Sequence, residues 1–363
     1  MSVFDFLQQP ELPRPDVTAA DAARVLEERY GVRGEIRELG SHQDRNFLVD
    51  TGERRALLKF SNAAFGADEL IAQNLAAATV AAAGVRAPVC IPSQHDEPIE
   101  TVRVGDQEYR VRLLDFVEGE PLTDHGAFTD AEAREMGDLA ARVALALRDV
   151  DHPGAAQRTQ WNLQVAREVL SLLVGDIPDA AKRETVERVA EAALARIEPV
   201  APVLRTQFIH GDISDDNAVR SADGRIDGVI DFGDAAISWT VAELAVTCVS
   251  MLYHNPRSPL VVLEVIAAFC ELVPLTDAEL DALWPLVQLR AAVLVASGEY
   301  QVVLEQDNAY ADENRRAEWL GLVTASRLDP DAMRSLIAWR LAGAPAGPVA
   351  APERPLLDAS GFT

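Results

Sequence analysis

Residues 35–115 alternate between apolar and polar positions in short runs that are typical of β-strands. The run EIREL (35–39) is followed by NFLVD and RRALLKF, and the turn TGE between these two predicts a β-hairpin. IETVRV and EYRVRLLDF predict a second hairpin, which turns at residues 105–107. Short strands joined by tight turns indicate an antiparallel sheet.

Two predicted helices accompany these strands. The first begins with a capping-box pattern at Thr18 and is expected to end at Gly31. The alanine-rich run ADELIAQNLAAATVAAAG predicts the second helix, which ends at Gly84. We therefore expect an α+β lobe over residues 18–114. A proline-interrupted arm over residues 1–17 precedes it and is either loose or ordered by its contacts.

The spacing of apolar residues changes after DFVEGEPL (115–122), whose glycine and proline predict a linker between two lobes. Residues 123–340 show mostly helical periodicity, which predicts a second, helical lobe. The exception is NAVRSADGRIDGVIDF (217–232), which predicts a small hairpin inside that lobe. Residues 341–363 are rich in Ala, Pro and Gly and predict a disordered tail. The expected fold class is α+β, with a small antiparallel-sheet lobe and a larger helical lobe.

The amino-acid composition limits which binding partners and which cellular location are expected for the protein. The 363-residue chain is long enough for two lobes. Its net charge of −25 argues against nucleic acid as a partner, because phosphates attract basic surfaces, and favours a small cationic molecule. The N-terminus has no signal-peptide pattern, and no apolar run approaches the ~20 residues of a membrane span. The three scattered cysteines, Cys90, Cys248 and Cys270, indicate reduced thiols in a cytoplasmic protein.

The acidic stretch HGDISDDN (210–217) follows the apolar run TQFI and is the first candidate for chemistry. Alone, it is typical of a solvent-exposed turn. The predicted hairpin changes this interpretation, because its second strand ends in VIDFGD and returns Asp231 toward the loop. Two carboxylates and a carboxamide, from Asp212, Asp231 and Asn217, are then expected to converge from one side.

These side chains are the set that phosphoryl transfer needs. One carboxylate accepts or orients the proton of an attacking hydroxyl, while an amide oxygen and a second carboxylate hold magnesium against a triphosphate. Gly211 would let the loop turn tightly, and His210 would be a structural residue that buttresses the loop by hydrogen bonding. Asp215 and Asp216 are expected to face solvent or to play a secondary part.

A nucleotide would also need a cation and a purine site, and both have candidates upstream. Lys59 lies in the strand-like run ALLKF, where a lysine requires an acidic partner, and the following helix offers Glu69. The extended linker RLLDFVEG, which contains Asp115 and Val117, could present backbone donors and acceptors to a purine.

HGDxxxxN followed by IDFGD resembles the signature of the aminoglycoside phosphotransferase/choline kinase family, whose fold is protein-kinase-like. Within that family, SHQDRNFLV, LLKFSN, AQN, LLDFVEGEPL and QDNAY look most like the hydroxylysine kinase and homoserine-kinase-like branch. The resemblance covers about residues 20–325. It implies a protein-kinase-like two-lobed fold with the active site between the lobes.

The resemblance also implies roles for individual residues. Asp212 would be the catalytic base, Asn217 and Asp231 the magnesium ligands, and Lys59 the contact to the α- and β-phosphates. The loop GSHQDRNF would cover the phosphates, with nucleotide contacts from three polar side chains: Ser41, Asp44 and Asn46.

Two features depart from the family pattern. The covering loop has a single glycine, so side chains as well as backbone amides would cover the phosphates. The helix position that usually carries the glutamate partner of the lysine falls on Gln73, with Glu69 one turn earlier. The partner of Lys59 therefore stays open at this point.

Two further side chains are candidates for the acceptor site. Arg290 lies on an otherwise apolar helix face, where it could bind a substrate carboxylate in bidentate fashion or form a buried structural ion pair. Asp234, with neighbouring acidic loop residues, could hold the ammonium group of a substrate.

These observations predict an enzyme that transfers the γ-phosphoryl group of ATP or GTP to a hydroxyl of a hydroxylated amine or amino acid, with Mg²⁺ as cofactor. The branch resemblance favours 5-hydroxylysine. Alternative acceptors are an aminoglycoside antibiotic, choline and ethanolamine, and a nucleotide-binding pseudokinase or regulatory module is the alternative outside enzymes. The chain has no P-loop, Rossmann, zincin or nucleophile-elbow motif. The sequence leaves open the acceptor, the nucleotide and the oligomeric state.

Overall fold

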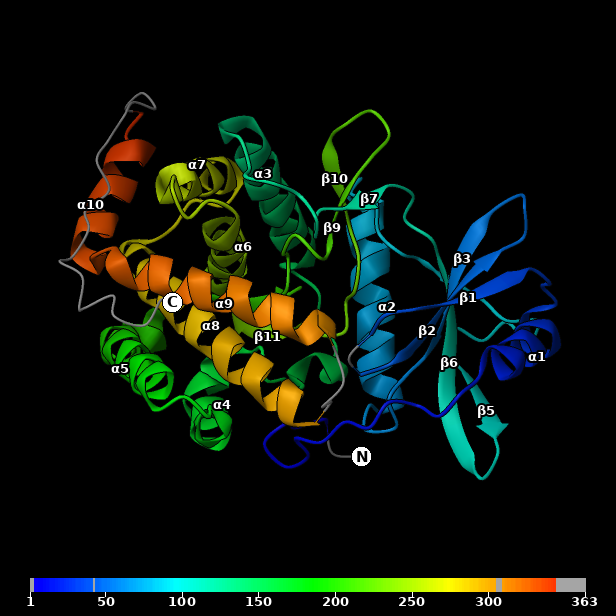
Figure 1. Ribbon diagram of the computed structural model, residues 1–363. Helices are drawn as coiled ribbons and strands as arrows, with labels where there is room; N and C mark the ends of the chain where they lie inside the picture. The colour runs from blue at the N-terminus through cyan, green and yellow to red at the C-terminus, as the bar shows by residue number, and fades with distance from the viewer. Residues whose placement is uncertain (1–2, 42, 305–308, 344–363) are drawn as a thin grey trace.

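The computed structural model describes residues 3–41, 43–304 and 309–343. Two lobes lie next to each other (Figure 1), one built around a sheet and the other a larger body of helices. The predicted α+β class with a small sheet lobe and a helical lobe is confirmed. The predicted tail lies outside the described residues from residue 344 onward.

The small lobe is built on a six-stranded antiparallel sheet, and both predicted hairpins are present in it. Its strands are β1 (Glu35–Leu39), β2 (Arg45–Asp50), β3 (Arg55–Phe60), β4 (Cys90–Ile91), β5 (Glu100–Val104) and β6 (Gln107–Asp115). The long strand β6 pairs with β3 along one edge and with β4 and β5 along the other. Helix α1 (Ala19–Tyr30) has the predicted capping box at Thr18 and packs Val25 and Leu26 into the core under the sheet.

Helix α2 (Ala67–Ala82) packs differently from α1. Its buried side chains, including Ala72 and Val80, belong to the core of the large lobe and not to the core under the sheet. Its first turn also touches a large-lobe turn closely, because a Cβ added to Gly154 would lie 2.0 Å from the carbonyl oxygen of Asp68. The helix is therefore anchored to the large lobe while it stands beside the sheet (Figure 1).

The large lobe is arranged around a long central helix, α8 (Asp277–Leu304), whose Trp284 and Leu289 are fully buried. The segment Asp277–Val302 is apolar and long enough to cross a membrane, contrary to the sequence-based expectation, but 83% of its most apolar stretch is buried in the protein. The other helices are α3 (Asp130–Leu147), α4 (Ala166–Leu173), α5 (Ala180–Ile197), α6 (Thr240–His254), α7 (Val262–Leu272), α9 (Ala309–Arg327) and α10 (Pro330–Leu341).

Two small sheets in the large lobe position the acidic loops. The predicted hairpin is present as β9 (Ala218–Arg220) and β10 (Ile226–Val229), and β7 (Glu120–Pro121) from the linker joins it as a third strand. A separate pair consists of β8 (Thr206–Ile209) and β11 (Ala236–Trp239). The chain therefore crosses between the two sheets twice, once from β8 to β9 and once from β10 to β11. HGDISDDN and DFGD are these two crossings.

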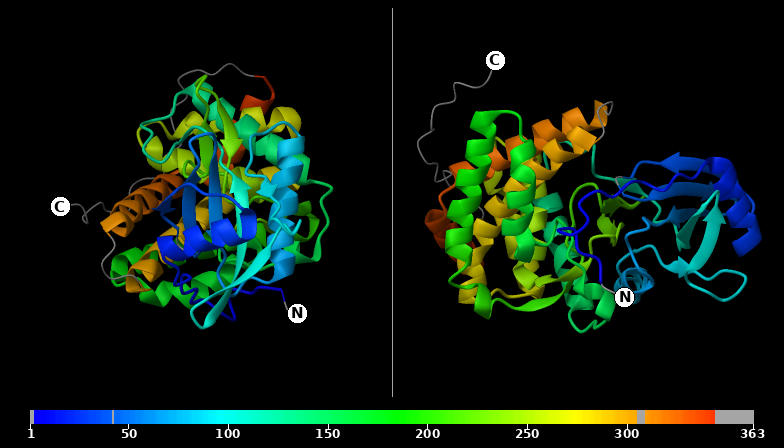
Figure 2. Two further views of the ribbon diagram at one scale, coloured as in Figure 1. Left: turned by 90° about the vertical axis from the view of Figure 1, so that its right-hand side faces the viewer. Right: turned by 90° about the horizontal axis from the view of Figure 1, so that it is seen from below.

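The described part of the N-terminal arm, from residue 3 onward, is ordered by contacts with both lobes (Figure 2). Phe4 and Phe6 exchange backbone hydrogen bonds with Arg158 of the large lobe, and Phe4 packs against Phe65 with 4.7 Å between ring centroids. Further along, the Asp16 N–H donates to the Tyr109 hydroxyl on the sheet at 3.2 Å. Of the two predicted states of the arm, the structure shows the one that is ordered by contact.

Candidate active site

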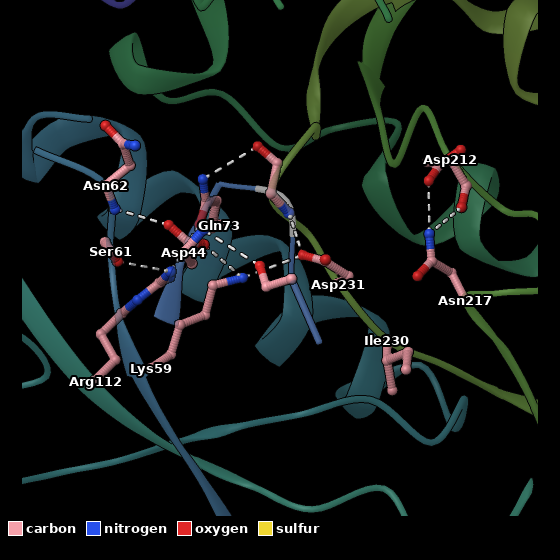
Figure 3. Close-up of polar contacts among 12 residues, drawn as sticks. Asp44, Lys59, Ser61, Asn62, Gln73, Arg112, Asp212, Asn217, Ile230 and Asp231 are labelled. Atoms are coloured by element: carbon pink, nitrogen blue, oxygen red, sulfur yellow. Dashed lines mark hydrogen bonds and ion pairs between the residues drawn. The ribbon is translucent and has the colours of Figure 1, made fainter. Parts of the chain in front are cut away.

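Lys59 on β3 is the cation predicted to contact the phosphates, and it is nearly fully buried. Its Nζ lies 2.9 Å from Asp44 Oδ2 and 3.2 Å from Asp231 Oδ1 (Figure 3). Burial disfavours the charged amine, but the two carboxylates outweigh it and hold the pKa of Lys59 above its usual range. Lys59 therefore stays charged and links the small lobe to the second acidic loop.

Of the two candidates that the sequence left open as the partner of Lys59, neither Glu69 nor Gln73 forms an ion pair with it. Glu69 Oε1 instead accepts a hydrogen bond from the Phe4 N–H at 2.7 Å, so this buried carboxylate holds the N-terminal arm. Gln73 accepts from Arg112 at 2.9 Å through Oε1. The physical reason is that α2 is anchored on the large lobe by its own packing, while a carboxylate from the loop before β2 reaches the lysine.

That carboxylate belongs to Asp44, in the loop before β2. Asn46 is opposite Lys59 in the β2–β3 register, and Asp44 lies two residues before Asn46, just outside the strand. Asp44 Oδ1 also accepts from the Asn62 N–H at 2.7 Å, which ties the loop to the segment after β3. Ser41 closes the loop, because its Oγ accepts from the Asp44 N–H at 3.2 Å. The predicted phosphate-covering loop is thus held by side chains.

Asp212 and Asn217 lie together in the first acidic loop (Figure 3). Asn217 Nδ2 donates to Asp212 Oδ2 at 2.7 Å and to the Asp212 carbonyl at 2.9 Å. Arg290 Nη2 donates to the other carboxylate oxygen, Oδ1, at 2.7 Å. Burial raises the pKa of Asp212 to about 6, although the charge of Arg290 acts in the opposite direction. The carboxylate is fixed in orientation and more basic than an ordinary aspartate.

The side chain of His210 connects the two acidic loops through hydrogen bonds to the backbone of each. Its Nδ1 accepts the Asp212 backbone N–H at 3.2 Å, which leaves Nε2 to donate to the Ile230 carbonyl at 3.1 Å. The imidazole also packs edge-on against Phe232 with 4.7 Å between centroids. Burial lowers the pKa of His210 to about 4, so the ring is neutral near pH 7 and can keep this hydrogen-bonding pattern.

Glu243 on α6 is a residue of the site that the sequence analysis did not single out. Its carboxylate accepts the backbone N–H of His210 at 2.7 Å and that of Gly211 at 3.2 Å. Burial raises its pKa to about 8. The available signal was a glutamate inside the apolar run TVAELAVTCVSML, because a buried acid in a helix needs donors to bind.

Asp215 is also placed differently from the prediction that it faces solvent. Its carboxylate is buried and accepts hydrogen bonds from Ser250 at 2.9 Å and from Tyr253, while His254 Nε2 lies 2.8 Å from it. All three partners come from α6, which passes behind the loop. Asp216 is exposed, as predicted.

Asp231 begins the second acidic loop in a conformation that few residues adopt. Its φ is 58°, in the left-handed region, and its Oδ1 accepts the Gly233 N–H at 3.1 Å. The Lys59 charge lowers the pKa of Asp231, whose side chain is about half exposed. A backbone hydrogen bond of 2.9 Å from Ile230 to Asn217 holds this loop beside the first one.

The donors on these loops suit a hard divalent cation that shares its shell with other ligands. Asn217 engages its amide nitrogen with Asp212, so its Oδ1 remains to face a cation, and Asp231 contributes carboxylate oxygens. Among the described residues, no group of three or more His, Cys, Asp and Glu side chains could hold a metal by itself. Nucleotide oxygens and water would complete the shell of an ion such as Mg²⁺.

A small pocket lies beside Gly211, and Asp234 is among the residues that line it. The carboxylate of Asp234 makes no ion pair or hydrogen bond with any described residue. Burial and the nearby Asp212 raise its pKa well above the usual range. The pocket is lined by Trp161, Asn162, Leu163, Ile209, Gly211, Asp234, Ala236, Ser238, Ala242 and Val246. An acid that lines a pocket without a direct ion pair to a described residue is a candidate partner for a ligand ammonium group.

The structure places the linker candidates at the junction of the lobes. The Asp115 N–H donates to the Val89 carbonyl at 2.8 Å, so this donor is already used. Val117 approaches β10, where a Cβ added to Gly228 would lie 3.1 Å from its side chain. Their contact with a purine stays a prediction.

Comparison with known proteins agrees with this geometry. Residues 35–284 match the model of the phosphotransferase enzyme family known as APH. Hydroxylysine kinase of Mus musculus is 27% identical over 322 residues, which cover 81% of this chain and 85% of that protein. Hydroxylysine kinase of Xenopus laevis is 26% identical over 356 residues, or 89% of this chain and 93% of that protein.

A solved structure shows the same fold. A microcompartment-associated aminopropanol kinase superposes with a TM-score of 0.69 at 20% identity, over 89% of this chain and 100% of the other. The fold is therefore kinase-like, and the family match extends from the sheet through the acidic loops into α8. The chain belongs to the APH phosphotransferase family and is a small-molecule phosphotransferase with a hydroxyl acceptor.

Proposed function

We propose that the enzyme transfers the γ-phosphoryl group of ATP or GTP to a hydroxylated amine or amino acid, with 5-hydroxylysine as the favoured acceptor. The observation that carries this proposal is the arrangement of the two acidic loops, in which Asp212 and Asn217 are joined while Asp231 contacts Lys59 of the opposite lobe. The acceptor is inferred from the hydroxylysine kinases to which the chain is similar.

Lys59 is proposed to contact the α- and β-phosphates. It now lies between the carboxylates of Asp44 and Asp231, which keep a buried positive charge at the junction of the lobes. Phosphate oxygens are strong acceptors for a charged amine and would replace part of this contact.

The remaining nucleotide contacts are proposed from position. Ser41, Asp44 and Asn46 lie in the loop that would cover the phosphates, and Asp115 and Val117 lie where the linker would meet the purine. The choice between ATP and GTP would depend on the linker, because the two purines differ in the donors and acceptors of their ring edges.

Asn217 and Asp231 are proposed to hold Mg²⁺. When bound, the ion supplies positive charge that offsets the negative charge on the phosphate oxygens. The residues contribute by position: Asp212 holds the Asn217 amide through its nitrogen, and the Asp231 carboxylate is held by Lys59 and by the Gly233 N–H.

Asp212 is proposed to receive the proton of the acceptor hydroxyl. The hydroxyl oxygen forms a bond to the γ-phosphorus, the bond from that phosphorus to the β–γ bridging oxygen breaks, and the nucleoside diphosphate leaves. A pKa of about 6 suits this role, because the group is mostly ionised at neutral pH yet more basic than an ordinary aspartate. Arg290 and Asn217 hold the carboxylate in place.

Asp234 is proposed to bind an ammonium group of the acceptor. A bound ammonium would offset the burial that now raises the pKa of this acid. The same pocket chemistry would serve an amino alcohol, and one structural neighbour is described as an aminopropanol kinase. Amino alcohols and aminoglycosides are therefore the alternative acceptors.

Nucleoside-diphosphate release would test the proposal, with ATP and GTP in parallel, Mg²⁺ present, and 5-hydroxylysine, homoserine, ethanolamine, choline and aminoglycosides as acceptors. We expect turnover with 5-hydroxylysine that is lost in Asp212→Asn. Preferred turnover of an aminoglycoside or choline would replace the acceptor but keep the reaction. Nucleotide binding without turnover of any acceptor would favour the regulatory-module alternative.

A further inference from the structure

Arg290 uses only part of its hydrogen-bonding capacity. It lies on α8 with 3% of its surface exposed, and its Nη2 donates to Asp212 at 2.7 Å. Its Nε and Nη1 find no hydrogen-bond partner within the ranges that the structure describes. Burial of unpaired N–H groups of a cation is costly, and the cost is larger than for a neutral donor. The unpaired N–H groups of Arg290 in the candidate active site are therefore expected to donate to hydrogen-bond acceptors of a bound ligand.

The guanidinium is held in a fixed position next to the acceptor pocket. Its central carbon lies 4.6 Å from the centroid of the Trp161 ring, and the same ring lines the pocket that contains Asp234. Stacking on an aromatic face fixes the plane of a guanidinium. Nη2 carries two N–H groups, and Asp212 Oδ1 occupies one of them. One edge with two parallel donors therefore remains, which is the geometry that a carboxylate matches.

The charges around Arg290 fit a zwitterion. Asp212 forms an ion pair with Arg290, whose charge also acts on Glu243 and Glu318. The Arg290 charge acts on Asp234 as well, but Asp234 forms no ion pair or hydrogen bond with a described residue. An amino alcohol could satisfy Asp234 but would leave the free Arg290 donors unpaired. An amino acid would bring a carboxylate for Arg290 together with an ammonium group for Asp234.

We propose that Arg290 binds the carboxylate of the acceptor and thereby selects hydroxylated amino acids over amino alcohols and aminoglycosides. This inference rests on the proposed function, because it assigns the acceptor class of the same site. The guanidinium that binds the carboxylate also holds Asp212, so it sets the position of the acceptor relative to the proposed base. Arg290 would be both a binding residue and a positioning residue.

Binding and turnover of two matched compounds would test the proposal. The compounds are 5-hydroxylysine and its decarboxylated analogue 1,5-diaminopentan-2-ol, which keeps the hydroxyl and both amines. We expect the wild-type protein to bind 5-hydroxylysine at least about tenfold more tightly in calorimetry without nucleotide, since hydrogen bonds to charged groups contribute this much or more. We expect the ratio of kcat/KM for the two compounds to show the same preference.

Arg290→Gln and Arg290→Lys separate carboxylate binding from a merely structural role. Loss of the Asp212 contact lowers kcat for both compounds, so the informative quantity is the ratio between them. We expect this ratio to fall to about one in Arg290→Gln and to an intermediate value in Arg290→Lys, whose amine keeps the charge but not the two parallel donors. A structural role alone would lower both activities and leave the ratio unchanged.

Arg205→Gln is the matched control. Arg205 pairs with the buried Glu279 in the first turn of α8, about 16 Å along the helix from Arg290. We expect the ratio of kcat/KM for the two compounds to be the same in Arg205→Gln as in the wild type. This result would exclude a general effect of a weakened α8. The wild-type comparison needs no variant and therefore holds even if Arg290→Gln does not fold.

The outcomes also distinguish this proposal from the proposed function. If 5-hydroxylysine binds more tightly than its analogue but is not phosphorylated, the carboxylate site is supported. The proposal that 5-hydroxylysine is the phosphoryl acceptor is then contradicted. Equal affinity for the two compounds, or a preference for the decarboxylated one, would overturn the assignment of Arg290 while leaving the phosphotransferase intact. Absence of binding of either compound would overturn it as well.

Discussion

The two sides of the site are held by different forces. On the large-lobe side, buried neutral or hydrogen-bonded groups hold the loop backbone: Glu243 accepts two N–H groups, and His210 connects the two loops. On the small-lobe side, Lys59 depends on charge, and one of its two partners, Asp231, belongs to the other lobe. Hydrogen bonds inside one lobe persist without a ligand, whereas ion pairs across lobes respond to a competing anion.

This difference separates chemistry from nucleotide binding. The proposed base lies on the preorganised side, where its neighbours are already positioned. The lysine lies on the side that can exchange a protein carboxylate for a phosphate. Changes on the large-lobe side should therefore act on turnover, and changes on the small-lobe side should act on nucleotide affinity.

The largest expected effect is that of Asp212→Asn. Removal of the proposed base should lower kcat by about 10²- to 10⁴-fold, with nucleotide affinity nearly unchanged. Steady-state kinetics and nucleotide titration would measure both quantities. Asp223→Asn, at the exposed tip of the β9–β10 turn, is the matched control and should behave as the wild type. If Asp212→Asn keeps a kcat near that of the wild type, Asp212 is not the catalytic base.

Lys59→Met should act mainly on the nucleotide. Loss of charge-assisted hydrogen bonds to phosphate should weaken nucleotide affinity by about tenfold or more. The variant also leaves Asp44 buried without its cation, so thermal unfolding should be measured in parallel. Unchanged nucleotide affinity in a folded Lys59→Met protein would contradict the division between the two sides.

The pH dependence of kcat/KM should reveal the raised pKa of Asp212. A base must be ionised to accept a proton, so activity should rise with pH and level off above about pH 6. Below that pH, the protonated fraction grows and activity should fall about tenfold for each pH unit. A plateau that continues down to pH 4 would show that the pKa of the base is not raised by burial.

The smallest effects should distinguish Asp44 from Glu69. Asp44→Asn removes one charge beside Lys59 and should change nucleotide affinity, whereas Glu69→Ala should leave it nearly unchanged. Glu69→Ala leaves the buried Phe4 N–H without its acceptor and should lower the free energy of unfolding by about 1–3 kcal/mol. Urea unfolding and nucleotide titration of both variants would decide the matter. The reverse pattern would restore Glu69 to the nucleotide site.

Local signals predicted the elements well. The capping box at Thr18 and the hairpin between Asn217 and Asp231 depend on residues close in sequence, and both are present. The acidic motif was informative because its strands, turn and polar residues all lie within one short stretch of chain.

The partners of these residues depend on contacts between distant segments. Asp44 reaches Lys59 through strand register, which the sequence does not specify. Asp215 is buried because α6 passes behind its loop, and the pattern of the loop itself gives no sign of this. Arg290 was left between two roles for the same reason, since its contacts with Asp212 and Trp161 join segments far apart in the chain.

The most direct test of the central claim is identification of the product that forms from 5-hydroxylysine, nucleotide and Mg²⁺. Mass spectrometry and phosphorus NMR would compare the wild-type protein with Asp212→Asn. The account predicts an O-phosphorylated hydroxylysine that accumulates with the nucleoside diphosphate and is nearly absent with the variant. Formation of inorganic phosphate alone, or equal amounts of phosphorylated product from both proteins, would contradict it.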